Sequence, residues 1–116
     1  MTPADAQGLE GPTWRAEQIN GSAAAGATIS ISIAPDGKIS GSGGCNRLTG
    51  SATITGPSIT FGPMASTRMA CAPAVMAQER SFLDALAIVR AFHIEDGRLV
   101  LLDAAGTEAI RFTQER

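Results

Sequence analysis

The sequence predicts a single α+β domain that is mostly β. We expect a small antiparallel sheet, curled or shaped into a partly open β-barrel, built from about seven or eight short strands with one α-helix packed on it. Three observations predict this fold. Hydrophobic and polar residues alternate along several short segments, turns rich in Gly and Pro separate these segments, and one stretch of helix-forming residues interrupts them.

Length and composition are consistent with one folded domain. The chain has 116 residues, of which 44% are hydrophobic and 17% are charged. It is therefore too apolar for a disordered chain and long enough to bury a core. We interpret residues 1–8 as a disordered leader or a cloning remnant, and residues 9–116 as the domain.

Charge and hydropathy exclude two classes of protein. The net charge is −2, and the nine basic residues are scattered along the chain. Because a nucleic-acid-binding protein normally concentrates its basic residues on one face, we expect no nucleic-acid partner. No apolar run approaches the roughly 18 residues that a membrane-spanning helix needs, so we expect no transmembrane span in this chain.

Period-two alternation predicts the strands of the first half of the chain. It is clearest at residues 28–33, where three isoleucines alternate with Thr and Ser. The turn sequences Asn20-Gly21, Pro35-Asp36-Gly37 and Gly56-Pro57 combine residues that favour tight turns. The expected strands are residues 13–19, 28–33, 38–40, 51–55 and 58–61.

One helix is expected over residues 74–87, with Pro73 at the first helical position. Its apolar stripe consists of Val75, Phe82, Leu83 and Leu86. Ile88 falls on the opposite face, so we expect the helix to end before it and a strand to begin there. The C-terminal strands are then residues 88–94, 98–102 and 109–113, with a hairpin turn at Asp96-Gly97.

The two cysteines, Cys45 and Cys71, lie in separate expected loops. A disulfide between them would stabilise the domain by about 3–3.5 kcal/mol in the chain-entropy model. Two unrelated buried thiols are the alternative. A redox-active pair is less expected because it usually has C-x-x-C spacing, and a zinc site needs about four ligands although His93 is the only histidine. We predict a structural disulfide and no metal.

Glu79 is the unusual residue of the expected helix, because it falls between Val75 and Leu83 inside the apolar stripe. A carboxylate that faces a core needs hydrogen-bond donors or a cation. Its candidate partners are Asn46, Arg68, Arg47 and the backbone N–H groups of residues 41–46. We predict a structural polar network of Glu79, Asn46 and Arg68 that pins this loop to the helix. The alternative is a rotated helix that lets Glu79 reach solvent.

Two further features were weighed as chemical sites. Gly41, Gly43 and Gly44 are compatible with an anion-binding nest, but the Lys-Ser/Thr sequence of a phosphate loop is missing, so we expect these glycines to let a strand bend. His93 is expected on a solvent-facing side of its strand, and no G-x-S-x-G motif is present. We therefore predict no catalytic residue.

Three segments together resemble the META/HslJ-like family of small bacterial and protist domains. They are Gly41-Ser42-Gly43-Gly44-Cys45-Asn46 with Gly50 after it, Thr67-Arg68-Met69-Ala70-Cys71, and Glu79 followed by Phe82, Leu83 and Leu86. Trp14, residues 99–101 and Phe112 complete the resemblance, which covers residues 9–113. The chain has Ala52 where the family often has an aromatic residue, which argues against an aromatic-lined pocket there.

The resemblance implies a β-barrel-like sheet with one helix and export to the bacterial envelope, often as a lipoprotein. It also implies an association with heat shock, antibiotic tolerance or secretion, and neither a catalytic residue nor a cofactor. We therefore expect a non-enzymatic domain, periplasmic or attached to the outer membrane, whose export signal or lipid anchor lies outside this sequence. It would bind an envelope protein or stabilise an assembly during stress.

A second functional hypothesis is a binder of a small hydrophobic ligand or lipid, held in a cavity between the sheet and the helix. The apolar residues that would line such a cavity are Ile29, Ile31, Ile33, Phe82, Leu86 and Phe92. The same residues would instead fill the core if the interior is fully packed. A third hypothesis, a thiol enzyme, requires Cys45 or Cys71 to be free and reactive.

Overall fold

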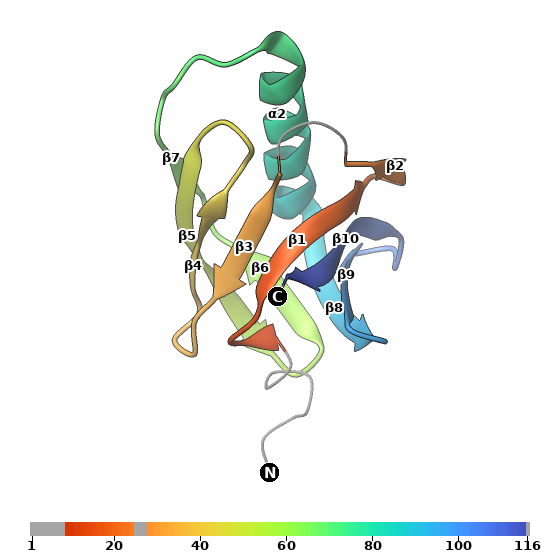
Figure 1. Ribbon diagram of the computed structural model, residues 1–116. Coiled ribbons are helices and arrows are strands. Elements are labelled where there is room, and N and C mark those ends of the chain that lie inside the picture. The colour runs from red at the N-terminus through yellow and green to blue at the C-terminus, as the bar shows by residue number, and fades with distance from the viewer. Residues whose placement is uncertain (1–8, 25–27, 116) are drawn as a thin grey trace.

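The computed structural model describes residues 9–24 and 28–115. Within these residues ten strands form one sheet, and helix α2 lies between β7 and β8 in the chain (Figure 1). The elements are β1 (Thr13–Ile19), β2 (Ser22–Ala23), β3 (Ser30–Ile33), β4 (Lys38–Ser42), β5 (Arg47–Thr55), β6 (Ser58–Phe61), β7 (Ala65–Ser66), α2 (Pro73–Ile88), β8 (Val89–Glu95), β9 (Arg98–Asp103) and β10 (Glu108–Glu115).

The sheet closes into an antiparallel barrel. Its strands follow one another in the order β10-β9-β8-β6-β5-β4-β3-β1, and β1 pairs with β10 to complete the ring. Two short strands add to this ring: β2 pairs with β1, and β7 pairs with β5. The mostly β fold class with one helix is confirmed. The strands form a closed barrel, because the first and last of them pair along most of their length.

Alternation and turn chemistry explain the strands that the sequence predicted. In β3, Ile31 and Ile33 are buried while Ser30 and Ser32 are partly exposed. The expected Asp96-Gly97 turn joins β8 to β9, and both of its residues have positive φ angles, 52° and 76°. Such angles suit Gly at no steric cost and are tolerated by Asp, which is why this pair specifies the hairpin.

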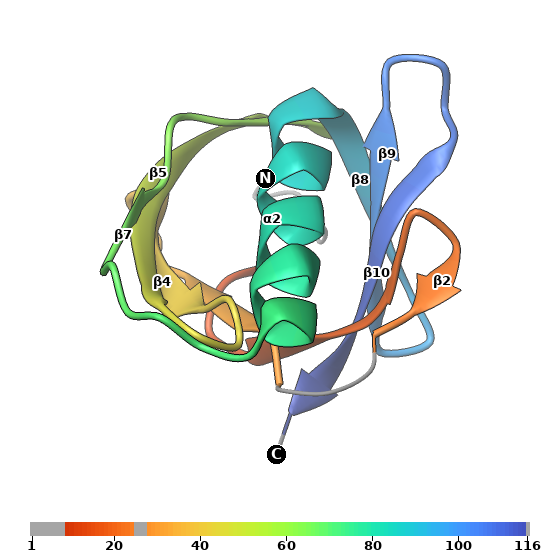
Figure 2. The same ribbon diagram turned by 90° about the horizontal axis from the view of Figure 1, so that it is seen from above.

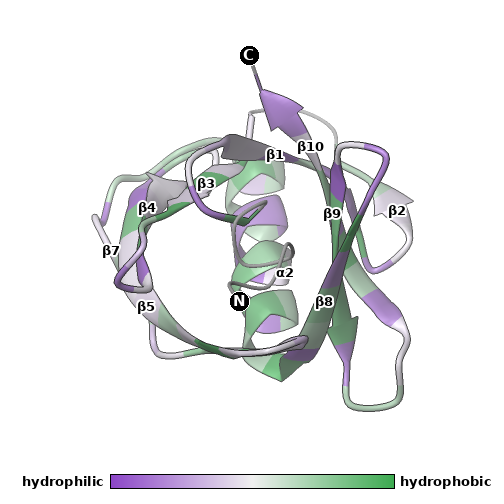
Figure 3. Ribbon diagram, turned by 90° about the horizontal axis from the view of Figure 1, so that it is seen from below, coloured by the Kyte–Doolittle hydropathy of each residue, from purple (hydrophilic) through white to green (hydrophobic). Residues whose placement is uncertain are grey.

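Helix α2 lies across the ring of strands, as the views from the two ends of the barrel show (Figures 2 and 3). Phe82, Ala85 and Leu86 face the interior together with Glu79, whereas Val75 and Leu83 are partly exposed. Figure 3 shows that α2 carries both hydrophobic and hydrophilic residues.

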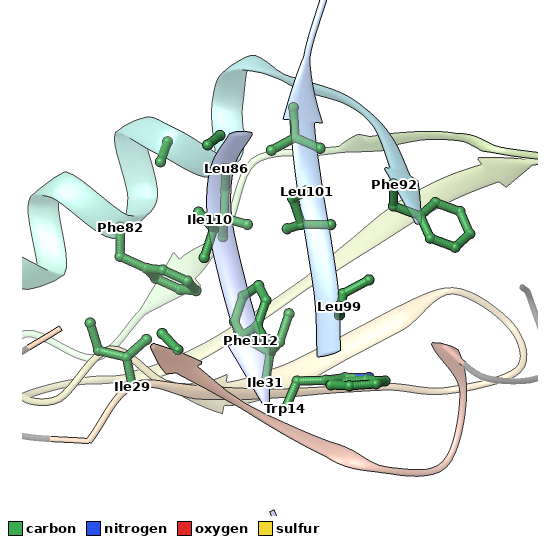
Figure 4. Packing of buried hydrophobic residues seen from close by; sticks show 14 of the residues in the cluster. Trp14, Ile29, Ile31, Phe82, Leu86, Phe92, Leu99, Leu101, Ile110 and Phe112 are labelled. Carbon is green, nitrogen blue, oxygen red and sulfur yellow. The ribbon is translucent and has the colours of Figure 1, made fainter. Parts of the chain in front are cut away.

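The core fills the space between the barrel wall and α2 (Figure 4). Phe82 of α2 and Phe112 of β10 meet edge to face, with ring centroids 6.1 Å apart. Trp14 is fully buried, and its Nε1 donates a hydrogen bond to the Leu9 carbonyl oxygen at 3.0 Å, which satisfies its polar atom. The six residues considered for a ligand cavity are all buried in this cluster: Ile29, Ile31, Ile33, Phe82, Leu86 and Phe92.

Most element boundaries shift by one or more residues from the sequence-based expectation; for example, β3 begins at Ser30 rather than at residue 28. Ile88 does not begin a strand: it is the last residue of α2, and its side chain is 48% exposed. The strand begins at Val89, which is fully buried, so the chain leaves the helix one residue later and exposes Ile88 instead. The expected long glycine loop is also shorter, because β4 extends to Ser42 and β5 begins at Arg47.

Gly41 lies within β4 because β3 passes too close for a side chain. A Cβ atom at this position would collide with the backbone oxygen of Ser30 and lie 2.8 Å from the Ile31 Cα. The glycine therefore permits a close strand pair rather than a loop. The sequence analysis expected these glycines to let a strand bend; Gly41 does lie within a strand, and its role there is to admit the neighbouring strand β3.

Candidate functional site

The loop of residues 43–46 between β4 and β5 is shaped to receive a carboxylate. The Gly43 N–H donates to the Asn46 carbonyl oxygen at 2.9 Å, and Gly44 has a φ of 101°, a conformation that favours glycine. Glu79 packs directly against Gly43: an added Cβ would lie 2.8 Å from the Glu79 Cδ. Gly43 is therefore required by the approach of this side chain from α2.

Glu79 is 7% exposed as a residue, and its carboxylate accepts three hydrogen bonds from the loop. Its Oε2 accepts from the Asn46 N–H at 2.7 Å and the Cys45 N–H at 3.3 Å. Its Oε1 accepts from the Asn46 Nδ2 at 2.8 Å. These donors satisfy a carboxylate that faces the core. The backbone donors expected for Glu79 within residues 41–46 are therefore those of Cys45 and Asn46, whereas the Gly43 and Gly44 N–H groups donate to the Asn46 carbonyl oxygen and to Ser42 Oγ.

Asn46 also accepts hydrogen bonds from the segment that connects β7 to α2. We call residues 67–72, which connect β7 to α2, the strap; Figure 2 shows this connection reaching the start of α2. The Asn46 Oδ1 accepts hydrogen bonds from the Met69 N–H at 2.7 Å and from the Thr67 Oγ1 at 3.0 Å. Thr67 Oγ1 accepts in turn from the Arg47 N–H at 3.0 Å. Asn46 therefore joins the loop, α2 and the strap.

A disulfide between Cys45 and Cys71 reinforces the same junction, with the two Cα atoms 6.0 Å apart. Cys45 belongs to the loop and Cys71 to the strap, just before α2. The covalent bond and the Asn46 hydrogen bonds therefore hold the strap at both of its ends. Neither cysteine is a free thiol in this structure, which does not support a thiol enzyme.

Arg68 does not join the network expected around Glu79. Its side chain is exposed, and within residues 9–24 and 28–115 it forms neither an ion pair nor a hydrogen bond. Thr67 and the Met69 backbone contact Asn46 instead. The Thr67 hydroxyl was visible in the T-x-M-A-C pattern, but a backbone donor such as Met69 N–H leaves no signal in a sequence.

An open groove of about 680 Å³ lies between the strap and α2. Met69 on the strap and Met76 on α2 line its two sides, and their side chains are 57% and 45% exposed. Leu83 of α2 also lines the groove and extends it into a second hollow of about 340 Å³ beside β6. The charged residues lining the groove are Arg68, Glu79, Arg80 and Asp84.

Among the residues that the structure describes, no group of three or more His, Cys, Asp and Glu side chains is arranged to hold a metal ion. His93 lies outside the groove on β8; it is exposed, and its Nε2 is 3.9 Å from a Glu95 carboxylate oxygen. Within the described ranges, no helix is long and apolar enough to span a membrane.

Comparison with known families identifies the domain. The model of the META domain family matches residues 7–116, nearly the whole chain. The chain belongs to the META domain family. A search of curated proteins found no significant match. The similarity suggested by the G-C-N and T-x-M-A-C segments is thus confirmed at the level of the family.

Solved structures share the fold of this META domain. An NMR structure of a protein from Burkholderia xenovorans is 26% identical, with a TM-score of 0.74 over 98% of this chain and 88% of that one. A second NMR structure is 23% identical, with a TM-score of 0.73 over 97% and 95% of the two chains. A crystal structure of a DUF4847 family protein from Bacteroides vulgatus is 18% identical, with a TM-score of 0.56 over 73% and 57%.

Proposed function

We propose that this META domain is a non-enzymatic docking module of the bacterial cell envelope that binds a protein partner in the groove between the strap and α2. The observation that carries the proposal is the pair of exposed methionines, Met69 and Met76, on the two sides of one groove. Methionine side chains are flexible and polarizable, and they recur on surfaces that bind apolar segments of other proteins. Large exposed apolar side chains gathered in one place favour an interaction site.

The rigidity of the strap supports docking. Binding a partner costs less free energy when the surface is already ordered. The Cys45–Cys71 disulfide and the hydrogen bonds of Asn46 order the strap without any partner. A disulfide also persists best in an oxidising compartment, which supports a periplasmic or outer-membrane-attached location. A role in stress or antibiotic tolerance is part of the proposal through the family resemblance alone.

The packing of the core favours a protein partner over a ligand buried between sheet and helix. The residues considered for such a cavity are at most 2% exposed and pack in one continuous cluster. A small apolar molecule would therefore have to bind in the open groove, where both sides remain in contact with solvent.

Site-specific photo-crosslinking in the envelope of the producing bacterium tests this function. A photoreactive residue placed at Ala77, which lines the groove, is expected to form a discrete crosslinked species with another protein. The same residue placed at Thr53, exposed on β5 and outside the groove, is expected to form none. The crosslinked protein, identified by mass spectrometry and purified, should then bind the isolated domain.

Charge variants show whether the methionines carry the binding. Met69→Glu and Met76→Glu should each abolish the crosslink from Ala77, because a charge on an apolar contact must be desolvated. Ile88→Glu is the matched control, since Ile88 is a similarly exposed apolar residue of α2 that does not line the groove. Equal crosslinking from Ala77 and Thr53, or a crosslink unaffected by both methionine variants, would contradict the docking function.

A further inference from the structure

The strand β7 has a free edge beside the groove. Thr67 N–H donates to the Arg47 carbonyl oxygen at 3.1 Å, and β7 pairs with β5 in the register Leu48↔Ser66 and Thr49↔Ala65. Hydrogen-bonded and non-hydrogen-bonded pairs alternate in an antiparallel ladder. Since Thr67 is bonded to β5, the N–H and C=O of Ser66 point away from β5. Ser66 also lines the groove, so this edge borders it.

The shortest strand pairing in the ring is the one between β6 and β8. Elsewhere, neighbouring strands of the ring pair over several residues, but β6 and β8 pair only at Ser58↔Ala91. The chain continues from β6 into β7 along the same edge of β5, and α2 crosses the ring (Figures 1 and 2). The position next to β7, where a further strand would pair, is therefore occupied by no strand of the described chain.

The charges of the groove are placed for an acidic group. Arg68 projects from the strap and Arg80 from α2, and both line the groove. In the described part of the chain neither guanidinium forms an ion pair. Of the two acids in the groove, Glu79 is already bound by loop N–H groups, and Asp84 lies one helical turn beyond Arg80. The two arginines thus leave a cationic pair without a partner near the strap.

We propose that the groove binds an extended segment of the partner protein by strand addition to β7, with apolar side chains on Met69 and Met76 and an acidic side chain between Arg68 and Arg80. This inference rests on the proposed docking function and specifies its occupant. The free N–H and C=O of Ser66 favour a peptide over a lipid, because only a peptide backbone supplies both a matching acceptor and a matching donor. Guanidinium groups bind carboxylates through charge-assisted hydrogen bonds.

The dimensions agree with a short segment. Helix α2 lines the groove from Met76 to Asp84, a length of about 12 Å at roughly 1.5 Å per residue. An extended peptide rises about 3.3 Å per residue, so about four residues lie along this part of the helix and an octapeptide is long enough to cover it. Successive side chains of an extended segment point to opposite faces, so apolar residues at alternate positions can form one face against Met69 and Met76.

Synthetic octapeptides test the inference on the intact, oxidised domain. Three blocked peptides are compared: one alternating apolar residues with Glu, one alternating them with Lys, and one Glu peptide N-methylated at alternate amides. The Glu peptide should shift the amide NMR signals of Ser66 and Met69 and slow hydrogen exchange of the Ser66 amide. The Lys peptide should bind at least about tenfold more weakly, and the N-methylated peptide should not protect Ser66.

Variants of Arg68 and Arg80 test whether the charges of the groove contribute to peptide binding. Arg68→Ala and Arg80→Ala should each weaken binding of the Glu peptide by about tenfold, the effect of one lost charge-assisted hydrogen bond. Arg15→Ala is the matched control, because Arg15 is exposed on β1 and lies outside the groove. Binding that tolerates N-methylation, or that is equal for the Glu and Lys peptides, would overturn strand addition.

Two further results distinguish the failure of this inference from failure of the docking function. Dodecanoate is titrated as a lipid probe: if it perturbs Met69 and Met76 while no peptide does, the occupant is an amphiphile and the inference is wrong. If crosslinking from Ala77 in cells persists while Ser66 stays unprotected by peptides, strand addition is wrong and docking stands. If the crosslink is absent as well, both are wrong.

Discussion

The two sides of this barrel are held together by different means. On the side of β1, β8, β9 and β10, long antiparallel ladders close the ring and cover a continuous apolar core. On the side of β7, the strap and α2, a two-residue strand, one disulfide and the contacts of Asn46 take over this role. The first side is held by many backbone hydrogen bonds between long strands, and the second by a few specific side-chain contacts and one disulfide.

This difference has a functional consequence. A wall of paired strands satisfies its backbone groups internally and leaves little for a partner to bind. A segment held at a few points keeps exposed side chains and free backbone groups, yet remains in one position. The groove with Met69 and Met76 lies on this second side. The comparison predicts that substitutions on the first side loosen all parts of the fold together, whereas those on the second side loosen the strap more than the ladders.

The largest effect is expected from Phe112→Ala on the ladder side. Phe112 is fully buried and meets Phe82 edge to face, so the substitution removes a ring from the centre of the core. We expect the free energy of unfolding to fall by about 3–5 kcal/mol. Urea denaturation measures this loss, and hydrogen exchange should accelerate in β9, β10 and the strap together. Acceleration confined to β10 would contradict a single cooperative core.

Removal of the disulfide is expected to have a smaller and less uniform effect. The double variant Cys45→Ala/Cys71→Ala should lose about 3 kcal/mol of unfolding free energy, because the unfolded chain is no longer constrained. Amides of residues 66–70 should exchange faster by a larger factor than those of β9, because the strap loses its covalent attachment. Reduction of the wild-type protein should reproduce both changes and leave the variant unaltered. Equal acceleration in the strap and in β9 would mean that the two sides are not separate.

Sequence patterns predicted the ladder side better than the strap side. The ladder strands leave strong signals, since alternation and the Asp96-Gly97 turn specify β8 and β9 locally. The pairing of β1 with β10 brings together strands that are far apart in the sequence, so no local sequence pattern predicts it. β7 has only two residues, too few for any alternation, and it forms because the Asn46 and Thr67 contacts bring it beside β5.

The polar site shows the same limit. Glu79 was identifiable because a carboxylate interrupts an apolar stripe, and Asn46 because it offers a side-chain donor in a nearby loop. Arg68 was expected to neutralise the Glu79 carboxylate, because a charged side chain can be identified in a sequence as a possible partner. The backbone N–H groups of Cys45 and Asn46 bind Glu79 instead. Every residue except proline carries such a donor, so only the loop geometry reveals which ones are used.

The smallest of the expected effects compares Glu79→Gln with Arg68→Ala. Both carboxylate oxygens of Glu79 accept hydrogen bonds, whereas a glutamine offers one oxygen and turns an NH₂ group toward another donor. We expect Glu79→Gln to lower the free energy of unfolding by about 1–3 kcal/mol, the cost of leaving a buried donor without a partner.

Arg68→Ala should change the free energy of unfolding by less than about 0.5 kcal/mol, as for an exposed side chain without a bonded partner. Chemical denaturation of both variants and of the wild-type protein in one buffer measures the difference. A larger loss for Arg68→Ala than for Glu79→Gln would mean that the arginine, and not the loop, neutralises the carboxylate. The specific groups on the strap side would then include a cation, and the groove would have one arginine fewer for an acidic partner.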